Sequence, residues 1–218
     1  MDKSPLSVTQ HSAAAHEDAR PPAGGEVQPV FYYDLASPES YLAAERVMAD
    51  LPVVPEWVPV DARGLAGAPG DPAERRAAVE ARAAEQHVQP LRWPAAWPNT
   101  DARPALIAAT YAKQIGRAVA FSLAAFRQAF AGGRDLGHES TVLIAGAACE
   151  MHPNAVLRAL QRDSIAAALD QATADARTAG VHSVPAIRVG RKVFHGERGL
   201  DDAAVALAQA LTASAPRP

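Results

Sequence analysis

The chain has 218 residues, of which 49% are hydrophobic and 21% are charged, a composition typical of one globular domain or of one domain with a large insertion. Its 21 Lys and Arg residues against 24 Asp and Glu residues give a net charge of −3, which argues against nucleic acid or an anionic membrane as a partner. No apolar run approaches the roughly 20 residues that cross a bilayer. The single cysteine, Cys149, excludes an intrachain disulfide or a Cys-based metal cluster, and a packed core thiol is expected there.

The N-terminal residues 1–28 are polar and rich in Ser, Ala, Pro and Gly. Because they contain no apolar core segment, they lack the pattern of a secretory signal peptide. We therefore expect a disordered tail and a cytoplasmic location.

A buried strand is expected over Val27–Leu35, which is apolar, aromatic and β-branched. A helix up to Asp50 should follow it. Ser37 suits the N-cap of this helix, where its hydroxyl can accept a backbone N–H. Pro38 suits the first turn, because its missing N–H would be unpaired there anyway.

The next part of the chain begins with a second strand, Pro55–Val60, and then becomes helical. Helices are expected over residues 72–87, 101–115, 117–131, 138–150, 153–160 and 163–178, interrupted by the proline-rich segment 93–99, which cannot be helical. Arg75 and Arg76 are interpreted as part of a solvated helix face. Two short strands, Ala186–Val189 and Lys192–His195, and a helix over Leu200–Leu211 complete the order.

This order of elements predicts an α/β fold with one four-stranded mixed sheet. Residues 29–62 supply a β-α-β half and residues 180–213 a β-β-α half. The block 63–179 is too long to be a loop, so a helical insertion packed over the sheet edge is expected.

Two motifs lie at the junctions of these halves. The first is the strand-to-helix turn Tyr33-Asp34 with Ser37–Ala43, and the second is Gly180–Pro185, which precedes the third strand. Over residues 27–211 the chain resembles the DsbA-like branch of the thioredoxin superfamily, in particular 2-hydroxychromene-2-carboxylate isomerases and kappa-class glutathione transferases. Matching segments in the insertion are Pro98–Thr100, Phe126–Phe130 and Gly133–Leu136. Where a disulfide oxidoreductase has Cys-x-x-Cys, this chain has Ser37-Pro38-Glu39-Ser40.

The resemblance implies a thioredoxin-like fold and a site for glutathione or another small thiol. Ser37 would be the catalytic residue, hydrogen-bonded to the sulfur, at a helix N-terminus that favours a thiolate. The alternative is that Ser37 only caps the helix. The resemblance also implies a cis peptide bond at Pro185, with the backbone of Val184 pairing with the thiol peptide.

Further ligand contacts are expected around this centre. Glu197 and Arg198 stand where relatives hold the γ-glutamyl end of glutathione, and Arg198 could instead grip a carboxylate or phosphate. Substrate contacts are expected from Glu39, Trp97, Asn99 and His182, and Glu39 would repel a nearby thiolate. No metal site is expected, because no residue spacing suits one.

The sequence therefore favours a thiol-dependent isomerase or transferase that acts on an aromatic or conjugated small molecule. The resemblance also points to a homodimer. One alternative is a degenerate thioredoxin-fold protein that binds a ligand or partner without catalysis. Another is a disulfide oxidoreductase, which would need Cys149 as its working thiol.

Overall fold

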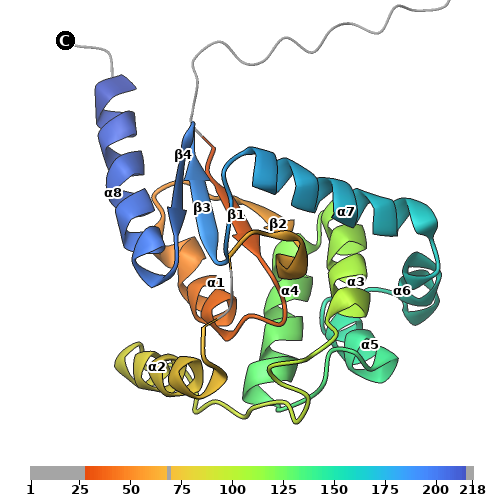
Figure 1. Ribbon diagram of the computed structural model, residues 1–218. Coiled ribbons are helices and arrows are strands. Elements are labelled where there is room, and N and C mark those ends of the chain that lie inside the picture. Colours follow the sequence, from red (N-terminus) through yellow and green to blue (C-terminus); the bar gives the residue numbers. More distant parts are fainter. Residues whose placement is uncertain (1–27, 68–69, 215–218) are drawn as a thin grey trace, which may run out of the picture.

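The computed structural model describes residues 28–67 and 70–214 (Figure 1). The tail expected over residues 1–28 lies outside the described residues except for Gln28. Four strands form one sheet: β1 (Val30–Tyr33), β2 (Glu56–Pro59), β3 (Ala186–Val189) and β4 (Lys192–His195). The first two strands are shorter than expected, because each pairs over only four residues before the chain turns away.

The sheet has the strand order β2-β1-β3-β4. β1 runs parallel to β2 and antiparallel to β3, and β3 runs antiparallel to β4. The four-stranded mixed sheet and the α/β fold class are thus confirmed. β1 is central, so the turn that follows Tyr33 emerges from the middle of the molecule.

The helices occur in three groups along the chain. α1 (Pro38–Asp50) joins β1 to β2, and α8 (Glu197–Ser214) follows β4. The others lie between β2 and β3: η1 (Ala62–Gly64), α2 (Pro72–Glu85), α3 (Arg103–Gln114), α4 (Ala118–Phe126), η2 (Arg127–Ala131), α5 (Glu139–Ala148), α6 (Pro153–Leu160) and α7 (Asp163–Thr178). The expected helical insertion is present, and segment 93–99 is non-helical as predicted.

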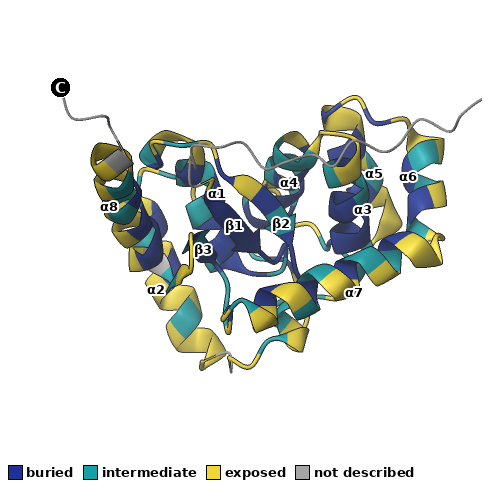
Figure 2. Ribbon diagram, turned by 90° about the horizontal axis from the view of Figure 1, so that it is seen from above, coloured by how far each residue is buried: buried dark blue, intermediate teal, exposed yellow. Residues whose placement is uncertain are grey.

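Side-chain alternation along β1 gives the sheet two buried faces. Phe31 and Tyr33 pack with residues of α1, α3, α4 and α8 in the main core, whereas Val30 and Tyr32 pack with Ala176 near the end of α7 in a smaller cluster. Figure 2 shows α7 on the opposite side of the strands from α1 and α4. The sheet is therefore covered on both faces.

Two helices differ most from the sequence-based prediction. The helix expected over residues 117–131 is α-helical only to Phe126, and its last turn, η2, is π-helical. The last helix begins at Glu197, three residues before the expected Leu200, because Gly196 ends the hairpin with a φ of +71° that a residue without Cβ adopts readily. Gly180, with a φ of +95°, follows the end of α7 in the predicted stop position.

Cys149 lies buried at the end of α5, where its thiol is close to the carbonyl oxygens of Ala145 and Gly146. Burial raises its pKa above the ordinary thiol value. The prediction of a packed core thiol is confirmed. Within residues 28–67 and 70–214, no helix is long and apolar enough to span a membrane, and no cluster of three or more His, Cys, Asp or Glu side chains could hold a metal ion.

Candidate active site

The turn between β1 and α1 forms one wall of the candidate site. Ser37 is the N-cap of α1, and its Oγ accepts the backbone N–H of Ser40 at 3.0 Å. The backbone N–H of Ser37 donates to the carbonyl of Asp34 at 3.0 Å, which closes a tight turn before the helix. Pro38 occupies the first helical position, as predicted. Ser37 is buried to 8% exposure, so the turn holds its hydroxyl in one place.

The Ser37 hydroxyl is also linked to a charged pair. Its Oγ donates to Oε2 of Glu39 at 2.9 Å. Glu39 in turn accepts two hydrogen bonds from the guanidinium of Arg75 on α2, at 2.9 and 2.8 Å. A bidentate pair of this kind compensates the carboxylate charge. The expected repulsion between Glu39 and a thiolate is therefore smaller than the sequence suggests, and the interpretation of Arg75 as part of a solvated face is wrong.

The opposite wall is the loop before β3. The Val184–Pro185 peptide bond is cis, as the resemblance implies, and Trp97–Pro98 is a second cis bond. The carbonyl of His182 accepts a hydrogen bond from the N–H of Gly67. The backbone N–H of His182 donates to Nε2 of His195 at 3.3 Å. Within the described residues, the backbone N–H and C=O of Val184 form no hydrogen bond. These two groups are the ones an added strand would use.

Both walls face one cavity of about 710 Å³, which falls in the size range of small-molecule sites. The start of α3 and the segment before it close the cavity from the insertion side. The residues that line it include Asp34, Ser37, Glu39, Asp61, Arg63, Arg75, Asn99, Asp101, Arg103, His182, Val184 and Pro185. The cavity thus joins the thioredoxin-like part of the chain to its helical insertion.

Asp34 is a buried carboxyl group in this cavity, with 5% exposure. Its Oδ1 accepts the N–H of Ala36 and its Oδ2 accepts the N–H of Ala62, both at 2.7 Å. Burial raises its pKa to about 6, although the two backbone N–H groups act in the opposite direction. A carboxyl group of this kind changes its charge near neutral pH.

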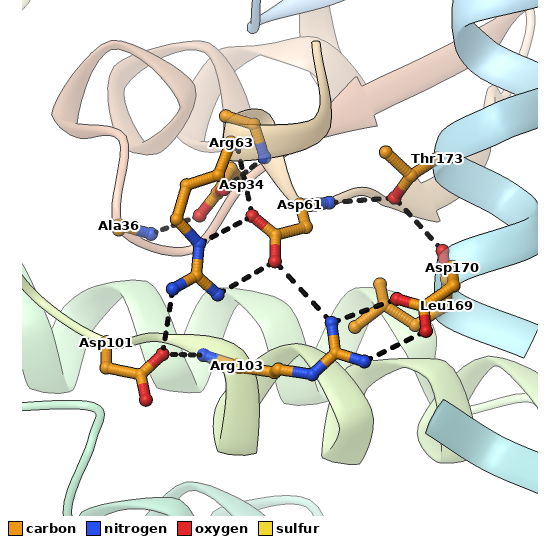
Figure 3. A network of polar contacts seen from close by, with 10 residues as sticks. Asp34, Ala36, Asp61, Arg63, Asp101, Arg103, Leu169, Asp170 and Thr173 are labelled. Carbon is orange, nitrogen blue, oxygen red and sulfur yellow. Dashed lines mark hydrogen bonds and ion pairs between the residues drawn. The ribbon is translucent and has the colours of Figure 1, made fainter. Parts of the chain in front are cut away.

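A charged network borders the cavity between η1 and α3 (Figure 3). Asp61 lies between two arginines: Arg63 donates to it at 2.9 and 2.8 Å, and Arg103 approaches to 3.6 Å. Arg103 also makes a bidentate pair with Asp170 of α7, at 2.9 and 3.0 Å. Burial of Asp61 opposes ionisation, yet hydrogen bonds from Arg63 outweigh it and lower the pKa. The network therefore ties the insertion to the sheet.

The structure brings together six of the predicted site residues. These are Ser37, Glu39, Asn99, His182, Val184 and Pro185, all of which line the cavity. Trp97 does not: it packs against Trp93 at 4.5 Å between ring centroids, with the Arg75 guanidinium 5.7 Å from its ring. Arg198 is exposed on the first turn of α8 and does not line the cavity either, because α8 begins earlier than expected. The side chain of Glu197 lies outside the described part of the structure.

Six charged residues of the cavity were not among the predicted site residues: Asp34, Asp61, Arg63, Arg75, Asp101 and Arg103. Asp34 belongs to the strand-turn motif. The others lie just after β2, on α2 and at the start of α3, where no motif indicates a site. The signal that could have found them is the position of Asp61 at the end of a strand parallel to β1, since the ends of adjacent parallel strands meet at one edge of the sheet.

His182 and His195 form a stacked pair beside the cavity, with ring centroids 3.7 Å apart. Burial, together with the neighbouring His182 ring, holds the pKa of His195 below its ordinary value. The neutral His195 is the form whose Nε2 can accept the N–H of His182. A depressed histidine pKa gives stability that is present above pH ~6.5 and is lost as the pH falls through the folded-state value.

Replacing His195 by glutamine is expected to make stability less sensitive to acid. The glutamine amide oxygen can still accept the His182 N–H, but it does not titrate. Urea unfolding at pH 7.5 and pH 5 should show a smaller loss of stability in His195→Gln than in wild type. His138→Gln, which changes an exposed histidine elsewhere, should keep the wild-type loss. An unchanged pH dependence in His195→Gln would show that the pair does not sense pH.

Comparisons with known proteins identify the family to which this fold belongs. The family model described as the DSBA-like thioredoxin domain matches residues 30–208, so the chain belongs to the DSBA-like thioredoxin domain family. A search of the curated proteins gives no match.

Two similar solved structures show the same fold. A 2-hydroxychromene-2-carboxylate isomerase superimposes with a TM-score of 0.74 and 20% identity, over 86% of this chain and 99% of that chain. A probable DsbA oxidoreductase from Streptomyces coelicolor gives 0.70 and 18% identity, over 88% and 92%. At these identities the likeness supports the shared fold, and the chemistry has to be argued from the cavity.

Proposed function

We propose that this protein is a small-thiol-dependent isomerase or transferase that acts on an aromatic or conjugated small molecule, with glutathione as the thiol. The observation that carries the proposal is that one cavity holds both Ser37, at the start of α1, and the backbone of Val184, which forms no hydrogen bond within the described residues. The similarity to a 2-hydroxychromene-2-carboxylate isomerase supports the same choice.

Each part of the cavity has a physical role in this proposal. The N-terminus of α1 carries partial positive charge and favours an anionic sulfur beside Ser37. The N–H and C=O of Val184 can pair with the backbone of a thiol peptide as an added strand would. Asn99, on the insertion side, offers a donor and an acceptor to the substrate.

The bound thiol would supply a nucleophilic sulfur that adds reversibly to an activated carbon. Addition to a conjugated system removes the double-bond character of one bond, so rotation and elimination give an isomer. If elimination does not follow, the product is a conjugate. The chain itself holds the sulfur, orients the peptide and shields the reacting atoms under the start of α3.

One observation favours the alternative, a thioredoxin-fold protein that binds a ligand without catalysis. The hydroxyl of Ser37 has one proton, and this proton is donated to Glu39. To donate to a thiolate, the hydroxyl must rotate away from Glu39. Oxidoreductase chemistry on Cys149 has no such support, because Cys149 is buried at the end of α5 and does not line the cavity.

A thermal-shift titration with glutathione tests the proposal. A ligand that binds only the folded state stabilises it by about 2.7 kcal/mol at a hundredfold excess over Kd. We expect wild type to be stabilised by glutathione and Ser37→Ala much less. His152→Ala, which removes the cap of α6 away from the cavity, serves as the matched control and should keep the full shift. No shift of wild type at millimolar glutathione would contradict the proposal.

The Glu39–Arg75 pair should affect the pKa of the bound thiol. Arg75→Gln leaves the Glu39 carboxylate without its partner beside the sulfur, so the pKa of the bound thiol should rise and glutathione should bind more weakly near neutral pH. Glu39→Gln should do the opposite. Arg76→Gln is the matched control, because Arg76 is on the same helix and stacks on Trp93. Calorimetry across pH 6 to pH 9 measures the effect, and equal affinities in all three variants would show that the pair does not act on the thiol.

A further inference from the structure

Asp34 is a cavity carboxyl group to which the proposed function has given no role. It lies three residues before Ser37 in the same tight turn, and both residues line the cavity. Both its oxygens are oriented by backbone donors from two different segments, Ala36 in the turn before α1 and Ala62 at the start of η1. Each carboxylate oxygen has two lone pairs, so each can accept a further hydrogen bond.

The other acidic groups of the cavity are held by arginine. Glu39 is paired with Arg75, and both Asp61 and Asp101 are paired with Arg63. Within the described residues Asp34 has no ion-pair partner, although the charges of Asp61 and Arg63 both act on it. Asp34 is therefore the cavity carboxylate that is least committed to a positive partner.

Resting on the proposed function, we propose that Asp34 is the proton-transfer residue of the site: its carboxylate takes the proton of a thiol bound at Ser37 and later returns it to the substrate. In the first step the S–H bond breaks, its electron pair stays on sulfur, and an O–H bond forms on Asp34. In the second step the carbon–sulfur bond forms, and the Asp34 proton moves to the atom of the substrate that receives the displaced electron pair. No further reactant is needed, and elimination runs the same steps in reverse.

Burial of Asp34 favours the transfer of a proton from the thiol to its carboxylate. The protein already disfavours the charged form of Asp34, and its pKa of about 6 suits a base that works near neutral pH. A thiolate arriving beside it adds a like charge, which favours the protonated carboxyl further. Sulfur and carboxyl then share one proton between them, as coupled sites do.

Carbon-13 NMR of labelled aspartate tests this directly, with Asp34→Asn used for assignment. In the free protein Asp34 should titrate near pH 6, and saturating glutathione should move this midpoint upward by about one pH unit or more. S-methylglutathione has the same backbone but no thiol proton, so it should leave Asp34 ionised at pH 7.5. Equal effects of the two peptides, or no change with glutathione, would overturn the proposal. If neither peptide perturbs the Val184 amide, the proposed function itself fails.

A second variant changes the titration of Asp34 without replacing Asp34 itself. Ala62→Pro deletes the N–H that Oδ2 of Asp34 accepts, and Ala62 is the first residue of η1 after an extended Asp61, where proline fits. Losing this donor should raise the midpoint of Asp34 titration and move the acid limb of glutathione conjugation to chlorodinitrobenzene to higher pH by the same amount. A shifted midpoint with an unmoved limb would assign Asp34 a structural role only.

Discussion

Replacement of Ser37 by alanine is expected to lower thiol-dependent turnover by roughly 10- to 100-fold, because a hydrogen bond to a charged group contributes about 1.5–3 kcal/mol. The measurement is the rate of glutathione conjugation to chlorodinitrobenzene, corrected for the uncatalysed reaction. The variant should also lose about 1 kcal/mol of stability, because Ser37 caps α1. The two effects must be separated.

Two further substitutions at position 37 separate them. Ser37→Thr keeps the hydroxyl and the cap, so turnover and stability should both stay close to wild type. Ser37→Gly removes the hydroxyl but costs only a few tenths of a kcal/mol as an N-cap, so stability should hold while turnover falls. If Ser37→Gly were as active as wild type, Ser37 would be only a helix cap, and a ligand-binding protein without catalysis would be favoured.

Loss of Asp61 should give the largest change in stability outside the apolar core. Asp61→Ala removes the cap of η1, two hydrogen bonds from Arg63 and the nearby partner of Arg103. We expect a loss of about 2 kcal/mol, reduced from the value for a fully buried pair because Arg63 is 62% exposed and therefore well solvated. Urea unfolding at pH 7 measures it.

Asp61→Asn keeps an oxygen for the cap and should lose about half as much stability. Asp101→Asn, at an exposed member of the same network, should change stability by less than about 0.5 kcal/mol. Because the pKa of Asp61 is lowered in the fold, its contribution is present above pH ~4 and is lost as the pH falls through the folded-state value. Asp61→Ala should therefore approach wild type in acid, and a constant difference across pH would contradict the role given to its charge.

The fold was largely predictable from sequence because its signals are local. Ser37 and Pro38 mark the start of α1 through cap chemistry, and Gly180 marks the end of α7. The short strands Ala186–Val189 and Lys192–His195 have the predicted bounds, since turn residues border them on both sides. The end of α4 was not predictable, because a π-helical turn leaves no clear pattern in the sequence.

Within the candidate site, the residues that could be predicted from sequence are mainly those that belong to a recognisable motif. Ser37 and Val184 belong to the two junction motifs, and the structure places them at one cavity. Arg75 and Arg103 reach the same cavity from helices of the insertion, and their positions depend on how the insertion packs over the sheet. Long-range packing of this kind has no local signature, so a helix with many charges is easily interpreted as solvated.

A crystal structure with glutathione tests the central claim most directly. The sulfur should lie within hydrogen-bond reach of Ser37 Oγ, with the peptide backbone paired to the N–H and C=O of Val184. Glutathione bound away from this cavity, or absent from it at millimolar concentration, would contradict the assignment of the cavity as a thiol site.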